Sequence, residues 1–194
     1  DGIDLFAASA PAERGVYFES YSGHLHYGWS PLAGWVDGRG KYLHSSEPEF
    51  YATLLDPAER YDLADSHGYE CGLARERMAG LLALPALAPD EGRPDEELAA
   101  ALAAIGYAHG ATAAAALPSP LLDSDRPSPK EGTHELEPLL RAHALFEQER
   151  FAACRELVAE IVRANPRHLL ALDLYSLCLM QAHDFEQAES ILRQ

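Results

Sequence analysis

Two histidines separated by a single residue are the first side chains whose types and spacing could do chemistry. His24 and His26 lie in the turn-prone, aromatic-rich segment SGHLHYGWSP, together with Tyr27 and Trp29. On an extended segment both imidazole rings would lie on one face, as a pair of metal ligands requires. No third ligand can be identified by spacing, and we therefore expect no metal site.

The three cysteines, Cys71, Cys154 and Cys178, are the other candidates for chemistry. They are too few and too scattered for a disulfide framework or a C-x-x-C metal knuckle. Cys154 and Cys178 fall within apolar helical patterns, where a cysteine is usually a small buried residue. We expect both of them in a hydrophobic core.

The composition excludes some classes of partner. The chain of 194 residues has 31 acidic and 15 basic side chains, which give a formal charge of −16. That charge repels phosphate backbones and anionic membrane surfaces, and no stripe of lysine and arginine offsets it. No apolar stretch reaches the roughly 18 residues of a membrane span. We therefore expect no nucleic-acid partner and no membrane span.

The first half of the chain is expected to be a small antiparallel sheet with helices. The segment 16–21, VYFESY, is rich in β-branched and aromatic residues and predicts a strand. Residues 35–43 predict a hairpin around the turn signal Asp-Gly, and residues 49–55 predict a third strand. Apolar spacing predicts helices over about 66–84 and 95–106.

The second half is expected to be all-helical, so that the whole chain belongs to the α+β class. Residues 108–133 are first alanine-rich and then carry prolines among serines and aspartates, which is typical of an exposed linker. We place this linker at 117–134, between a first domain, 1–116, and a second, 135–194. Helices are predicted over about 135–148, 151–164, 168–182 and 185–194, with a break at Pro166.

A 34-residue echo links these four predicted helices. It pairs small residues with small and large with large: Ala142/Ser176, Leu145/Leu179, Phe151/Phe185, Cys154/Ala188 and Val158/Leu192. Repeats of this period are helix-turn-helix hairpins, which cannot bury their apolar faces alone and must stack on a neighbour. We therefore expect this end of the chain to offer a surface to a partner.

The residue order of the echo resembles a tetratricopeptide repeat (TPR). The resemblance implies that the hairpins bind a peptide or a protein surface in a concave groove, through polar side chains of the first helix of each repeat. Arg141, Asp173 and Gln181 are the candidates, and the alternative is that they are simply solvated surface. Because the second repeat stops at Gln194, within its second helix, self-association through a bare end face is the other expected interaction.

The first half resembles the C-terminal part of sulfatases. Residues 37–43, DGRGKYL, are similar to the family's D-G-R-x-K-Y-I strand, and residues 49–51, EFY, followed by 56–59, DPAE, are similar to its E-L-Y-D-L-x-x-D-P-x-E run. Residues 52–53 and Asp62 depart from the pattern, which has Asp-Leu and Asn there. The resemblance implies the C-terminal subdomain of an alkaline-phosphatase-like α/β enzyme, in a subgroup that carries TPRs.

The catalytic parts implied by this resemblance lie outside the chain. Sulfatases hydrolyse sulfate esters with a formylglycine, made from the cysteine of C-x-P-S-R, and a bound Ca²⁺, both in the N-terminal part of the enzyme. Residues 71–75, CGLAR, have only the outline of that motif, and residues 65–68, DSHG, scramble the family's metal-binding D-H-G turn. We expect no catalytic residue and no cofactor in this chain.

In the intact enzyme, the loop that contains His24, His26, Tyr27 and Trp29 would border the substrate pocket, because imidazole and aromatic groups suit a sugar or aryl ester that carries sulfate. The alternative is that Tyr27 and Trp29 only pack against the sheet. The expected function is a C-terminal fragment of a sulfatase-like sulfuric ester hydrolase with a TPR protein-interaction module, not catalytic by itself. The rival is a stand-alone TPR-containing scaffold protein.

Overall fold

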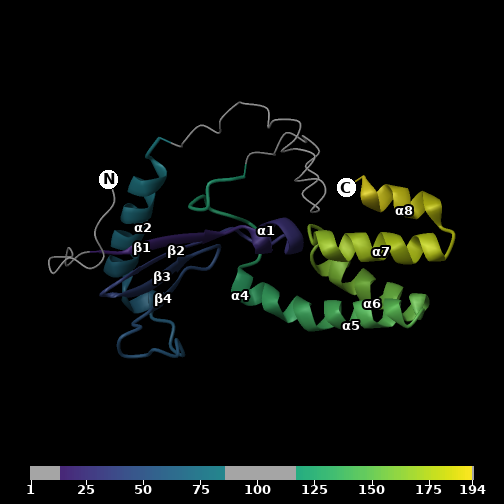
Figure 1. Cartoon of the computed structure of the whole chain (residues 1–194), viewed down its shortest axis with the longest axis horizontal. Coiled ribbons are helices and arrows are strands. Elements are labelled where there is room, and N and C mark those ends of the chain that lie inside the picture. The colour runs from purple at the N-terminus through teal and green to yellow at the C-terminus, as the bar shows by residue number, and fades with distance from the viewer. Residues whose placement is uncertain (1–13, 86–116, 194) are drawn as a thin grey trace, which may run out of the picture.

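The computed structural model describes residues 14–85 and 117–193. Figure 1 shows a sheet half, formed by the first of these ranges, beside a set of packed helices formed by the second. The short helix α1 (Ser22–Tyr27) connects the two, because it packs against α7 (Leu169–Gln181). The fold is therefore α+β, as expected. The helix predicted over 95–106 lies outside the described residues.

A four-stranded antiparallel sheet forms the first half. Its strands follow one another in sheet order: β1 (Val16–Ser20), β2 (Leu32–Asp37), β3 (Gly40–His44) and β4 (Glu49–Tyr51). The predicted hairpin is confirmed, with Asp37 paired to Gly40 across a two-residue turn. A glycine is needed at position 40, because a Cβ there would lie 2.4 Å from the carbonyl oxygen of Tyr51.

Strand β4, which was predicted over 49–55, is shorter than expected because the chain turns directly after Tyr51. The amides of Leu55 and Asp56 both donate to the carbonyl oxygen of Ala52, at 2.9 Å. The carboxylate of Asp56 then accepts hydrogen bonds from the amides of Arg60 and Tyr61, at 2.6 and 2.9 Å. This loop is thus held by its own hydrogen bonds rather than by strand pairing.

The segment between β1 and β2, expected to be turn-prone, contains the short helix α1, so it does not have the extended conformation that a histidine metal pair would need. Helix α1 ends at Gly28, whose φ of 70° lies in the left-handed region that favours glycine. A Cβ at Gly28 would lie 2.5 Å from the carbonyl oxygen of Arg167, so the glycine also permits the close approach of α1 to the turn before α7. Residues i and i+2 of a helix point to different sides, and His24 and His26 therefore do not share a face.

Helix α2 (Gly68–Leu82) covers one face of the sheet, as Figure 1 shows. It confirms the helix predicted over 66–84 and follows the short 3-10 turn η1 (Ala64–Ser66). Ala74 and Met78 of α2 are buried in a core cluster with four strand residues: Ala33, Trp35, Tyr42 and Phe50. Removal of this apolar surface from water drives the packing of helix on sheet.

The segment 117–134 is anchored to the sheet half and does not form the exposed linker that was expected. Ser128 is fully buried. Its hydroxyl caps α4 (Pro129–Gly132) by accepting from the amide of Glu131 at 3.1 Å, and it donates to the carboxylate of Glu47 at 3.2 Å. The serine and proline that resembled a linker thus supply an N-cap and the first residue of a helix, which are positions that both residue types favour.

Four helices form two packed hairpins, and all four were predicted. They are α5 (Leu136–Glu147), α6 (Phe151–Ala164), α7 and α8 (Phe185–Leu192), preceded by the 3-10 turn η2 (Thr133–Glu135). Three of these helices share one hydrophobic core, whose buried members are Leu139, Ala142, Cys154, Val158, Ile161, Ala171, Leu174 and Cys178. The prediction that Cys154 and Cys178 are core residues is confirmed.

The backbone repeats the 34-residue echo of the sequence. The turn within each hairpin contains one residue with positive φ, Glu149 at 58° and His183 at 59°. The next residue of each turn, Arg150 or Asp184, donates its amide at 2.9 Å to the carbonyl oxygen five residues earlier. The turns of the two hairpins therefore have the same conformation.

Candidate functional site

The sheet half and the helical half meet at a buried polar cluster, which we call the junction. Its members come from α1, the second residue after it, η2 and the turn before α7: Tyr27, Trp29, Glu135, Asn165 and His168. The indole of Trp29 donates to a carboxylate oxygen of Glu135 at 2.8 Å. The amide nitrogen of Asn165 donates to the carbonyl oxygen of Tyr27 at 2.8 Å and lies 3.2 Å from both carboxylate oxygens of Glu135.

His168 is the most buried polar member of the junction, with none of its side chain exposed. Its Nδ1 atom caps α7 by accepting from the amide of Ala171 at 3.2 Å, which places the proton of the neutral ring on Nε2. Nε2 lies 3.9 Å from Glu135, too far for a hydrogen bond, and has no partner among the described residues. Burial lowers the pKa of His168, while the charge of Glu135 acts in the opposite direction.

The four residues expected to border a substrate pocket do not gather on one open surface. The rings of Tyr27 and Trp29 stack at 4.5 Å, and Trp29 is buried at the junction. His24 lies half-buried with Nδ1 3.2 Å from the carbonyl oxygen of Trp29, and the exposed His26 contacts the carbonyl oxygen of Ser22 at 3.0 Å. The structure thus brings Tyr27 and Trp29 together as packing residues, with the two histidines on other sides of α1.

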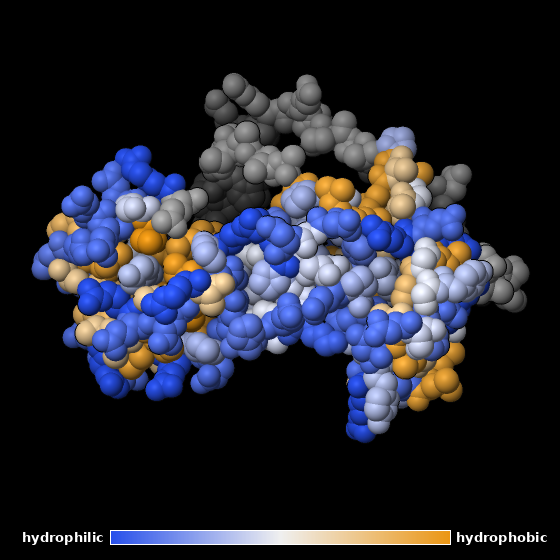
Figure 2. All heavy atoms as spheres, turned by 180° about the vertical axis from the view of Figure 1, so that it is seen from behind, coloured by the Kyte–Doolittle hydropathy of each residue, from blue (hydrophilic) through white to orange (hydrophobic). Residues whose placement is uncertain are grey.

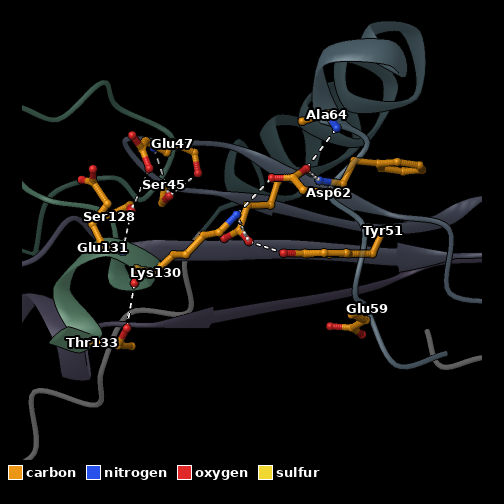
Figure 3. A network of polar contacts seen from close by, with 12 residues as sticks. Ser45, Glu47, Tyr51, Glu59, Asp62, Ala64, Ser128, Lys130, Glu131 and Thr133 are labelled. Carbon is orange, nitrogen blue, oxygen red and sulfur yellow. Dashed lines mark hydrogen bonds and ion pairs between the residues drawn. The ribbon is translucent and has the colours of Figure 1, made fainter. Parts of the chain in front are cut away.

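A second polar cluster joins α4 to the sheet, and Figure 3 shows it around Lys130. The ammonium group of Lys130 lies 3.3 Å from a carboxylate oxygen of Glu49 and 3.3 Å from one of Asp62. The other oxygen of Asp62 accepts from the amides of Phe50 and Ala64, each at 3.1 Å. Burial alone would raise the pKa of Asp62, but these amides and Lys130 outweigh it and lower the pKa. Lys130 therefore balances the charge of Asp62.

The three groove candidates are all exposed, but they do not line one groove. Arg141 on α5 borders an open groove between α5 and α6, whose charged lining residues are Arg141, Arg150, Glu156 and Glu160. Asp173 and Gln181 lie on α7 and do not line that groove. Figure 2 shows hydrophilic and intermediate residues over the middle of the rear face, and apolar residues interspersed with hydrophilic ones towards both ends.

Sequence reasoning missed three of the five junction residues, Glu135, Asn165 and His168. Tyr27 and Trp29 were singled out for their types, but their partners lie more than 100 positions away in the chain. The usable signal was local: His168 stands at the start of a predicted helix, three residues before the amide that it caps. No group of three or more histidine, cysteine, aspartate or glutamate side chains is arranged to hold a metal ion within residues 14–85 and 117–193.

Comparison with known proteins returned no match to a family model, to a curated protein or to a solved structure. Within the part of the chain that the structure describes, none of the helices combines the length and apolar character that a membrane crossing needs. The functional assignment therefore depends on the chain's own residues and geometry.

Proposed function

We propose that this chain is the protein-interaction region of a sulfatase-like hydrolase, in which TPR-like hairpins bind a partner and the sheet half is the enzyme's C-terminal subdomain. The observation that carries the binding role is the duplicated hairpin. The two hairpins leave the polar side chains of their first helices, Arg141 on α5 with Asp173 and Gln181 on α7, open to solvent. Stacked hairpins of this kind present extended binding surfaces.

The sulfatase-like motifs support the second part of the proposal, because each of them has a structural role in the sheet half. Residues 37–43 form the β2–β3 turn and most of β3, and residues 49–51 form β4. In the D-P-x-E segment, the carboxylate of Asp56 accepts hydrogen bonds from two backbone amides of the loop, and Glu59 forms an ion pair with Lys41 of β3. The motif thus fastens the loop after β4 to the neighbouring strand.

That fastened loop presents apolar side chains to solvent. Leu54 and Leu55 are 80 % and 89 % exposed, and Tyr61 is 69 % exposed. Ordered apolar residues gathered at one place are typical of a surface that packs on another protein part. In the proposed enzyme this surface would pack on the catalytic part.

The junction gives the proposed module a fixed geometry. Because buried hydrogen bonds connect Trp29 to Glu135, and Asn165 to the end of α1, the hairpins do not swing freely about the sheet half. A partner on the hairpins would therefore be held at a constant position relative to the subdomain.

Peptide selection tests the binding role. Peptides are selected from a display library against the chain, and their affinity is measured by calorimetry. The triple variant Arg141→Ala/Asp173→Ala/Gln181→Ala should bind them at least ~10-fold more weakly than the natural chain, since a few side chains carry most of the affinity of such surfaces. The matched control is Glu189→Ala/Arg193→Ala, which removes an exposed ion pair on and just after α8 and should leave affinity within about twofold. Equal loss of affinity in both variants would contradict the assignment of these three residues to the binding surface.

The gene upstream of Asp1 tests the hydrolase role. A C-x-P-S-R motif in the same reading frame supports it, and the joined product should hydrolyse an aryl sulfate while this chain alone does not. A start codon directly before Asp1 would instead favour the stand-alone scaffold protein.

A further inference from the structure

Two buried thiols lie in contact between the two hairpins. The sulfur atoms of Cys154 on α6 and Cys178 on α7 are 3.3 Å apart. Their side chains are 0 % and 1 % exposed and belong to the shared core of the hairpins. Cys71, the third cysteine, lies in α2 of the other half and is partly exposed. The chain therefore contains one pair of adjacent thiols and one thiol apart from it.

The distance between these sulfur atoms is short for two thiols that are not bonded. A disulfide needs a separation of about 2.05 Å, so the atoms must approach by only ~1.3 Å. Small rotations about the Cα–Cβ bonds of both residues supply a movement of that size. The helices that carry them are packed directly against each other.

We propose that Cys154 and Cys178 are a modification site at which oxidation forms a disulfide between the hairpins. The bond would join α6 of the first hairpin to α7 of the second. Since the relative angle of successive hairpins sets the shape of the binding surface, the disulfide would hold that surface in one form. This role goes beyond partner binding and does not depend on which partner binds.

The oxidant of this reaction is another disulfide, such as oxidised glutathione. The thiolate of one cysteine attacks a sulfur of oxidised glutathione, forms a mixed disulfide and expels one glutathione thiolate. The thiolate of the second cysteine attacks the protein sulfur of that mixed disulfide, forms the Cys154–Cys178 bond and expels the second glutathione thiolate. The two protons of the protein thiols end on the two glutathione molecules.

Burial determines when this reaction occurs. Burial raises the pKa of Cys178 to about 12, with its contact to Cys154 adding to the effect, and burial also raises the pKa of Cys154. The attacking thiolate is therefore scarce in the folded chain, and glutathione must reach a closed core. Oxidation will be slow in the native state and fast while the hairpins are folding, and the finished bond will be shielded from reductants.

The test is to refold the reduced chain from urea in a buffer of reduced and oxidised glutathione, block free thiols with N-ethylmaleimide and digest with trypsin. We expect peptides 151–155 and 168–193 to be recovered as one disulfide-linked species, with Cys71 alkylated. The oxidised chain should melt about 5–10 °C above the reduced chain, because the cross-link constrains the unfolded state. Oxidation of the native chain should be at least ~10-fold slower than oxidation during refolding.

The controls separate this bond from other thiol chemistry. Cys71→Ser should form the link and gain stability as the natural chain does. Cys154→Ala should fold, because the equivalent residue of the second hairpin is Ala188, and it should show no gain on oxidation. The proposal is overturned if Cys71 enters the disulfide, if only glutathione adducts form, or if Cys154→Ala gains stability like the natural chain.

Discussion

At the scale of single residues, His168 has two tasks that conflict when it is protonated. Its Nδ1 atom must stay unprotonated to accept the amide of Ala171, yet a charged ring would be attracted to Glu135. The ring of Tyr27 meets the imidazole edge-on at 5.2 Å, and the imidazole is fully buried. Burial decides the balance, so the neutral form is favoured and the pKa is lowered.

This lowered pKa predicts a loss of stability in acid. As pH falls below about 6.5, the ordinary pKa of histidine, the unfolded chain binds a proton that the folded chain does not, and the free energy of unfolding decreases. His168→Asn keeps an N-cap acceptor without titrating and should lose less stability between pH 7.5 and pH 5 in urea unfolding. The exposed His143→Asn is the matched control and should follow the natural chain. Equal slopes in all three proteins would contradict the assignment.

Among single substitutions at the junction, we expect Glu135→Ala to cause the largest loss of unfolding free energy. Glu135→Ala leaves the indole of Trp29 and the amide of Asn165 buried without their acceptor, which costs about 3 kcal/mol of unfolding free energy. Glu137→Ala, an exposed position on α5, should change stability by less than about 0.5 kcal/mol. Urea unfolding at pH 7.5 measures both, and a loss under about 1 kcal/mol for Glu135→Ala would show that the cluster is not energetically coupled.

At the scale of elements, the spacing of apolar residues was enough to predict the helices and the hairpin that local sequence determines. The four hairpin helices, α2 and the β2–β3 hairpin all appear where spacing and turn residues placed them. Helix α1 was missed because its six residues are too short for a periodic pattern, and its end depends on the contact of Gly28 with Arg167, 139 positions later by their numbers. The anchoring of 117–134 was missed for the same reason, because the hydroxyl of the buried Ser128 donates to Glu47, which is distant in the sequence.

Substitutions of two glycines test the difference between structure set by local sequence and structure set by long-range contacts. Gly28→Ala forces a side chain into the left-handed region and against the carbonyl oxygen of Arg167, and should cost about 2 kcal/mol of unfolding free energy. Gly72→Ala, inside α2 with nothing within 4 Å of the added Cβ, should instead gain about 0.5–1 kcal/mol from helix propensity. Thermal and urea unfolding give both signs, and a stabilising Gly28→Ala would show that α1 does not pack as described.

At the scale of the whole molecule, the junction decides whether the two halves act as one body. Each half has its own hydrophobic core, around Met78 in the sheet half and around Leu174 in the hairpins. Two cores joined by a flexible linker would unfold independently, whereas the buried bonds of Trp29 and Asn165 make opening of the junction costly. The candidate site is therefore visible only in three dimensions, since its polar members come from both halves.

The two methionines of the chain can report on the two halves separately. Met78 lies in the sheet core and Met180 lies on α7, so carbon-13 labelling of methionine methyl groups gives one signal for each half. In the natural chain we expect both native signals to disappear at the same urea concentration, within about 0.2 M. In Glu135→Ala the Met180 and Met78 transitions should separate, because loss of the junction removes the coupling while each core survives. Separate transitions already present in the natural chain would mean that the junction does not couple the two halves. The proposal that the hairpins hold a partner at a constant position relative to the sheet half would then be wrong.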